Sequence, residues 1–108
     1  MDKFTYKGRY FEQSDCYFQA QKYQNGNNAL IIEHEEEGRI CVCSVNGSKV
    51  LNGDEIGIKN WSENEGMDEF LIDMGIIENE PFEYESSGFV QIPYYKLTKK
   101  GLELFEGV

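Results

Sequence analysis

Residues 55–77 read EIGIKNWSENEGMDEFLIDMGII, which predicts a strand, a helix start, an amphipathic helix and a helix stop in immediate succession. The pattern Ser62-x-x-Glu65 is a capping box, in which the serine oxygen accepts from an amide of the first turn and the glutamate reaches back. Ser62 is therefore the expected N-cap of a helix over residues 63–74. Gly75 follows at the position of the left-handed residue that ends many helices.

The predicted helix has one apolar face. Its apolar side chains recur at i, i+3, i+4 and i+7, the spacing of a single stripe on a helix, and they are Met67, Phe70, Leu71 and Met74. The acidic residues Asp68, Glu69 and Asp73 fall elsewhere on the helix surface. We therefore expect the apolar stripe to pack on a sheet and the acidic face to stay in water.

The first half of the chain alternates apolar and polar residues, as strands do. This alternation predicts strands over residues 4–10 and 16–24, with a turn at residues 12–15 between them. Asn25-Gly26 lies between two alternating runs, which is the strongest short signal for a hairpin. The strand over residues 16–24 should therefore pair antiparallel with the next one.

The remaining segments add strands and a last helix. Residues 39–46 carry apolar side chains on both faces, which favours a central strand. Residues 78–88 are polar and acidic and predict a surface loop. Residues 89–97 resemble a strand, but Pro93 cannot donate a ladder hydrogen bond, so we expect an edge or a bulge there. Thr98 is the expected N-cap of a short C-terminal helix.

Together these segments predict a single α+β domain over residues 1–108, with about five mostly antiparallel strands packed on one main helix (63–74) and a short C-terminal helix. A chain of 108 residues with 40% hydrophobic content is enough for one core. The sequence has neither an apolar run long enough to cross a membrane nor a secretory leader, so we expect a cytoplasmic protein without a membrane partner.

Three cysteines and one histidine are the candidates for redox, metal or acid–base chemistry. Cys16, Cys41 and Cys43 are odd in number, and the Cys-x-Cys spacing lacks the second half of a zinc site. His34 has no neighbour in sequence that would orient it as a general base. We expect reduced, mostly buried thiols, no metal site, no cofactor and no enzymatic activity.

The net charge of −10 lies in one segment. Residues 54–85 hold eleven acidic residues and one basic residue, Lys59, whereas the rest of the chain holds nine of each. Affinity for nucleic acid comes mainly from Lys and Arg, so this charge disfavours a nucleic-acid partner and favours a protein partner with a basic surface. The alternative is that the acidic face only keeps the protein in solution.

The residues expected to bind such a partner lie at the start and on the acidic face of the helix: Trp61, Glu65, Asp68, Glu69 and Asp73. Trp61 can either staple the start of the helix or serve as an exposed anchor. A second functional hypothesis is a regulator that binds nucleic acid through a basic C-terminal segment with Lys96, Lys99 and Lys100.

Three blocks of the sequence resemble consecutive blocks of a family of small uncharacterised proteins from phages, plasmids and other mobile elements. The blocks are NGNNALIIEHEEEGRICVCSVNG (25–47), EIGIKNWSENEGMDEFLIDMGII (55–77) and SGFVQIPYYKLT (87–98). The most specific part is residues 58–66, and the match covers residues 25–98. The resemblance implies a single domain of mobile-element origin and transfers no catalytic residue. With the charge, it favours a binding or inhibitory module that acts on a basic, nucleic-acid-handling host protein.

Overall fold

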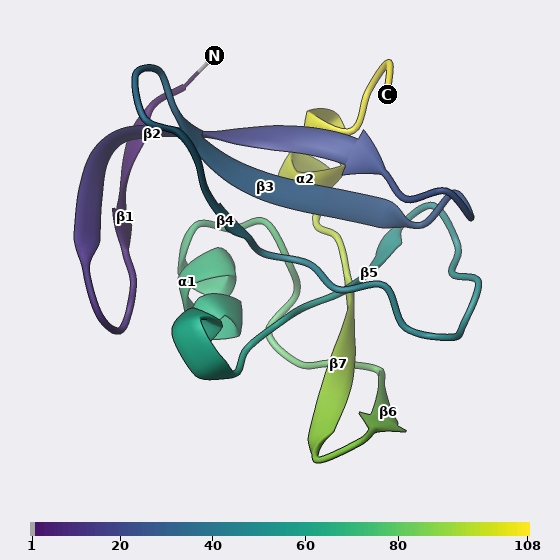
Figure 1. Cartoon of the computed structure of the whole chain (residues 1–108). Coiled ribbons are helices and arrows are strands. Elements are labelled where there is room, and N and C mark those ends of the chain that lie inside the picture. The colour runs from purple at the N-terminus through teal and green to yellow at the C-terminus, as the bar shows by residue number, and fades with distance from the viewer. Residues whose placement is uncertain (1) are drawn as a thin grey trace.

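The computed structural model describes residues 2–108 and contains two antiparallel sheets and two short α-helices (Figure 1). The four-stranded sheet has the order β1-β2-β3-β4, and the three-stranded sheet has the order β5-β7-β6. The predicted α+β class with mostly antiparallel strands is confirmed, although the described residues form seven strands rather than about five. Within residues 2–108, no helix has the length and apolar character needed to cross a membrane.

The elements follow one another along the chain, and the longest stretches between them are residues 43–54 and 74–82. The strands are β1 (Phe4–Lys7), β2 (Glu12–Lys22), β3 (Asn28–His34), β4 (Gly38–Val42), β5 (Glu55–Gly57), β6 (Glu83–Ser87) and β7 (Val90–Lys96). The helices are the 3₁₀ turn η1 (Ser62–Asn64), α1 (Met67–Asp73) and α2 (Lys99–Leu104).

The hairpin predicted at Asn25-Gly26 is confirmed. Strands β2 and β3 pair antiparallel along seven residues of each strand. Gly26 has a φ of +90°, in the region that favours glycine, and the N–H of Tyr23 donates to the carbonyl oxygen of Asn27 at 2.8 Å. This turn sets the register of β2 and β3.

The first strand is shorter than the alternation predicts. Strand β1 ends at Lys7, and the N–H of Gly8 donates to the carbonyl oxygen of Phe11 at 3.0 Å. Strand β2 starts directly afterwards, so the turn predicted at residues 12–15 is wrong. A Cβ on Gly8 would lie 2.8 Å from the Tyr6 ring, and glycine therefore allows the chain to reverse there.

Residues 43–45 join the two sheets. The N–H of Cys43 donates to the carbonyl oxygen of Leu30 at 2.8 Å, and its own carbonyl oxygen accepts from the N–H of Lys59 at 2.9 Å. The central strand predicted over residues 39–46 is wrong in its first part, because β4 is the edge of its sheet. Only the residues after β4 have backbone partners on both sides.

The helix predicted over residues 63–74 begins later than expected. Ser62 has a φ of +54° and opens a 3₁₀ turn, and no side chain caps either this turn or α1. The predicted capping box is therefore wrong, and the N-cap of α1 is Gly66 with a φ of +86°. Asn64 is buried and donates its side-chain N–H to the carbonyl oxygen of Val42 at 2.6 Å. This bond to β4 holds the chain in a turn where the local sequence favours helix.

The end and the apolar face of α1 match the prediction. Gly75 has a φ of +76° and donates its N–H to Ile72, while the N–H of Ile76 donates to Leu71, both at 2.9 Å. These two bonds form a Schellman motif. All four residues of the predicted stripe belong to the core or pack against it: Met67, Phe70, Leu71 and Met74.

The three-stranded sheet differs most from the prediction. Strand β6 occupies part of the loop predicted over residues 78–88, and β7 lies between β5 and β6 although Pro93 predicted an edge or a bulge. The carbonyl oxygen of Pro93 accepts from the N–H of Ile58 at 3.1 Å, one residue beyond the last β5 pair at Gly57. The missing N–H of proline therefore falls at the end of the pairing with the β5 segment, where it interrupts no ladder that runs further.

The C-terminal helix is capped as predicted and packs very closely. The Thr98 hydroxyl oxygen accepts from the N–H of Gly101 at 3.0 Å. Gly101 is buried, and a Cβ at this position would lie 2.2 Å from the carbonyl oxygen of Ile76. Glycine therefore lets the backbone of α2 rest against the segment that follows α1, and Phe105 is buried in the core.

The contact at Gly101 predicts that Gly101→Ala lowers the free energy of unfolding by about 1–3 kcal/mol, as overpacking usually does. Gly53→Ala is the matched control, because nothing lies within 4 Å of its added Cβ. Its effect should stay within about 0.5 kcal/mol. Denaturant unfolding followed by tryptophan fluorescence measures both, and equal midpoints for the two variants would contradict the close contact.

Removing the side-chain oxygen of each of the two candidate N-caps, Thr98 and Ser62, should change the free energy of unfolding by different amounts. Thr98→Ala removes an observed N-cap bond and should lower the free energy of unfolding by about 1 kcal/mol. Ser62→Ala removes no capping bond and should change it by less than about 0.5 kcal/mol. Chemical denaturation of both variants tests this, and a larger loss for Ser62→Ala would restore the capping box.

Candidate functional site

A groove of about 700 Å³ lies between β1, the turn that follows it, and α1. Phe70 and Met74 supply apolar lining from the helix. The other charged and polar lining comes from both sides: Thr5, Lys7 and Arg9 from the hairpin, and Glu65, Glu69 and Asp73 from the helix and the residues before it. Figure 1 shows the β1–β2 hairpin beside α1 at the left of the view.

The apolar lining is held by aromatic packing on β1. The Phe70 ring meets the Tyr6 ring edge-on, with centroids 5.0 Å apart and planes at 88°. Its centroid lies 5.9 Å from that of Phe4. Edge-to-face contacts of this kind add to the stabilisation from burial, so the wall of the groove is part of the core rather than a mobile side chain.

The charges of the groove are only partly balanced. Arg9 Nη1 lies 3.0 Å from Glu65 Oε2, and the two side chains are 63% and 47% exposed. An ion pair this exposed stabilises by only about 0–1 kcal/mol. Among residues 2–108, no ion pair involves Glu69 or Asp73. The helix side of the groove therefore has two carboxylates without an ion-pair partner, and Lys7 lines the same groove from the hairpin side.

The structure brings together three of the five residues that the sequence nominated for partner binding, namely Glu65, Glu69 and Asp73. Asp68 serves a different purpose. Its carboxylate accepts from the Asn60 side-chain N–H at 3.1 Å and from the Tyr95 hydroxyl at 3.0 Å. Burial and this carboxylate raise the pKa of Tyr95, so the hydroxyl stays protonated and keeps donating. Asp68 is thus a structural acceptor.

Trp61 does not line the groove. It is half-buried and precedes η1 in an extended conformation. Because α1 begins at Met67, Trp61 is too far upstream to staple the helix start, and that interpretation is wrong. Its role as an anchor for a partner stays a prediction.

Sequence reasoning missed the hairpin side of the groove. Lys7 and Arg9 lie about sixty residues from α1 in sequence, and no local pattern signals that they meet it. Phe70 and Met74 were recognised as apolar but were assigned wholly to the core. Both are only partly buried, which leaves part of each side chain at the groove.

The three basic residues of the second functional hypothesis differ in their surroundings. Lys96 lies 2.7 Å from a Glu55 carboxylate oxygen and 3.7 Å from Asp54, and the bond to Glu55 raises the pKa of Lys96. Lys100 donates to the carbonyl oxygen of Met74 at 2.8 Å. Lys99 is exposed at the start of α2.

The three cysteines are free thiols that are buried or half-buried in the domain. Cys16 and Cys43 are buried, Cys41 is half-buried, and all three are free. Burial raises the pKa of Cys43, whereas hydrogen bonding with Cys43 and Tyr6 lowers the pKa of Cys41. Within residues 2–108, no three His, Cys, Asp or Glu side chains gather in an arrangement that could hold a metal ion.

His34 shapes the acidic turn between β3 and β4. Its Nδ1 accepts from the backbone N–H groups of Glu36 and Glu37, each at 3.1 Å. A ring nitrogen that accepts two backbone bonds organises the turn in the way that Asn and Asp side chains do elsewhere. The histidine therefore has a structural explanation.

Comparison with protein-family models, curated proteins and solved structures gives no match for this chain. The resemblance to small proteins of mobile elements stays a prediction. The function of the groove is therefore argued from its own residues.

The contrast between the acids of α1 predicts different stability effects. Asp68→Ala leaves the Tyr95 hydroxyl without its acceptor and should lower the free energy of unfolding by about 1–3 kcal/mol. Asp73→Ala, the same change on the same helix at an exposed position, should stay within about 0.5 kcal/mol. A double-mutant cycle with Tyr95→Phe measures the coupling, and additive effects would contradict the bond.

Proposed function

We propose that this protein is a small acidic binding module that occupies a basic surface on a host protein that handles nucleic acid. The observation that carries the proposal is the pair Glu69 and Asp73, two exposed carboxylates without an ion-pair partner beside the apolar lining of the groove. The stem of a lysine or arginine packs on apolar surface while its charged head stays near acids and water. The groove offers both environments side by side.

The chain's own Arg9 supports this view of the groove. Its guanidinium already lies against Glu65 at 3.0 Å, so the groove accepts a basic side chain from the hairpin. An arginine of a partner can replace Arg9 at small cost, because an exposed ion pair contributes little stability. The net charge of −10 would also speed association with any basic surface.

The placement of the C-terminal lysines favours a protein partner over nucleic acid. Binding to phosphates requires lysine and arginine side chains that are free to neutralise them and so release the cations condensed on the nucleic acid. Lys96 is already paired with Glu55, and Lys100 is bonded to the end of α1. The mobile-element origin implied by the sequence resemblance belongs to the proposal but is not needed to test it.

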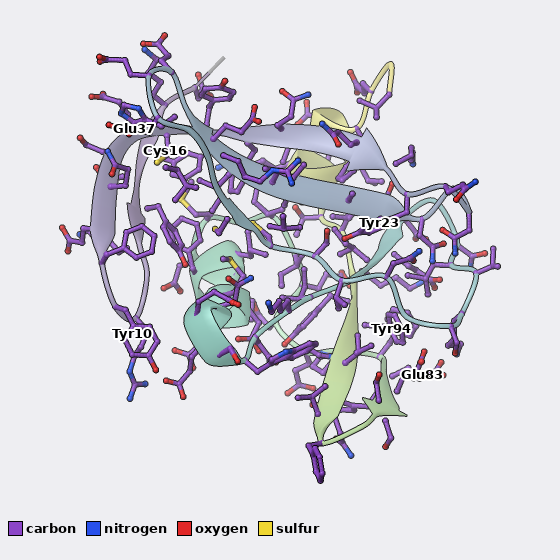
Figure 2. All side chains as sticks on the ribbon, viewed as in Figure 1. Tyr10, Cys16, Tyr23, Glu37, Glu83 and Tyr94 are labelled. Atoms are coloured by element: carbon purple, nitrogen blue, oxygen red, sulfur yellow. The ribbon has the colours of Figure 1, made fainter. Side chains whose placement is uncertain are left out.

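The test compares two charge reversals of equal size. Glu69→Lys/Asp73→Lys changes the groove, and Glu36→Lys/Glu37→Lys changes the exposed turn between β3 and β4, which Figure 2 shows well away from α1. Basic proteins retained from host lysate by the wild type should be lost by the groove variant and kept by the turn variant. Retention should weaken as salt rises, since screening acts over roughly 8–10 Å at physiological ionic strength.

Two outcomes would contradict the proposal. Equal loss in both variants would mean that only the overall charge matters, as expected of an acidic surface that serves solubility. Tight binding of the wild type to DNA or RNA, measured directly, would favour the nucleic-acid regulator. Circular dichroism of both variants shows that each is folded before binding is compared.

A further inference from the structure

We propose that the outer edge of β6 receives an extended segment of a partner protein as an additional strand, and that this segment alternates basic and apolar residues. None of the β6 residues lines the groove, so this surface goes beyond the function proposed above. Figure 1 shows the β6–β7 hairpin projecting from the rest of the domain at the bottom of the view, with β6 outermost.

The backbone of β6 leaves hydrogen-bonding groups open. In an antiparallel pair, the N–H and C=O of one residue point to the same side, and the side alternates along the strand. Pro93 directs its carbonyl toward the β5 side, where Ile58 donates to it. Tyr84 pairs with Pro93 and therefore points its N–H and C=O away from β7, as Ser86 does two residues later. Among the residues that the structure describes, no strand covers that side.

Exposed aromatic side chains accompany this open edge. Phe89, in the turn between β6 and β7, is fully exposed. Tyr84 on β6 is 58% exposed. Phe82, the residue before the first residue of β6, is 42% exposed. Open edges are normally blunted by proline, a bulge or charged side chains, especially lysine. Strand β6 has no lysine, proline or bulge, and its two charged residues are Glu83 and Glu85. An edge with free backbone groups and exposed aromatic rings is suited to strand addition.

The acids on one face of β6 decide which side chains the added strand should carry. Glu83 and Glu85 lie on the face of the sheet that holds Tyr94, and Figure 2 shows Glu83 and Tyr94 close together. Glu83 forms an ion pair with Lys49, so among the described residues Glu85 is the acid of β6 without a basic partner. Glu85 accepts from the Tyr94 hydroxyl at 2.6 Å and from Ser48, and these neutral donors lower its pKa, so its charge persists. An added strand would place alternate side chains beside these acids and the others beside Tyr84. Basic residues suit the first position, and apolar residues suit the second.

A second copy of this chain is a poorer occupant of the edge. Antiparallel pairing of two β6 strands would bring Glu83 and Glu85 of both copies along the same face, and like charges across a sheet are destabilising. Each copy also carries a net charge of −10. The charge of the edge therefore selects a basic strand.

The experiment uses a synthetic peptide of about eight residues that alternates lysine and valine, with both ends blocked. The full-length protein should bind it, and the backbone amides of Tyr84 and Ser86 should become protected from hydrogen exchange. Ser86→Pro removes one outward N–H while leaving the bonds to β7, and it should weaken binding at least tenfold. Ser86→Ala keeps the amide and should bind like the wild type.

A matched peptide separates strand addition from simple attraction. N-methylation of its valine amides keeps the charges and side chains but removes the donors that would pair with Tyr84 and Ser86, and affinity should fall at least tenfold. Equal binding of both peptides, or no protection at Tyr84 and Ser86, overturns the proposal. Protection of these amides in a dimer without peptide overturns it in favour of a second copy.

The two proposals fail separately. The groove variant Glu69→Lys/Asp73→Lys should keep the wild-type affinity for the peptide, because its changes lie outside β6. A loss of peptide binding in that variant, with unchanged exchange at Tyr84 and Ser86, would assign the peptide to the groove and overturn the edge proposal. If Ser86→Pro does not fold, exchange in the wild type decides the question.

Discussion

Backbone hydrogen bonds on both sides of residues 43–45 hold the two sheets together, and the placement of both proposed surfaces depends on them. Cys43 donates to Leu30 of β3 and accepts from Lys59, which lies between β5 and η1. The Ser44 hydroxyl adds a second tie, because it accepts from the N–H of Leu30 at 3.0 Å. These groups are buried, so a lost partner would leave a polar group unsatisfied at a cost of about 1–3 kcal/mol. Residues 43–45 therefore hold the two sheets in a fixed arrangement. The chain that continues from Lys59 leads to α1 and so fixes the position of that helix.

Features that depend on neighbours in sequence could be predicted, and features that depend on distant partners could not. The hairpin at Asn25-Gly26, the helix end at Gly75 and the cap at Thr98 each need only a few consecutive residues. The capping box at Ser62 is equally local, yet it is absent. The buried side chain of Asn64 bonds to Val42, twenty-two residues earlier, and this contact replaces the first turns of the expected helix.

The same distinction explains the sheet and the groove. Pro93 suggests an edge only if neighbouring strands pair along the whole of β7, and β5 ends too early for that. The acids of the groove were found because charge can be counted along the chain. The opposite wall, with Lys7 and Arg9, depends on how β1 packs on α1 through Phe70, and sequence alone does not show this contact.

The structure also sorts the acids that the sequence could only count. Several of the eleven carboxylates in residues 54–85 have partners within the domain: Asp54 and Glu55 pair with Lys96, Glu63 with Lys59, Glu65 with Arg9, Glu83 with Lys49, and Asp68 and Glu85 accept from hydroxyl groups. A carboxylate held by neutral donors keeps its charge in a fixed orientation. Among the described residues, Glu69, Asp73, Glu78 and Glu80 have no such partner, and only Glu69 and Asp73 of these four line the groove. A basic partner therefore meets far fewer usable acids than the net charge suggests. Recognition by this domain must then depend on where those few acids stand relative to apolar surface.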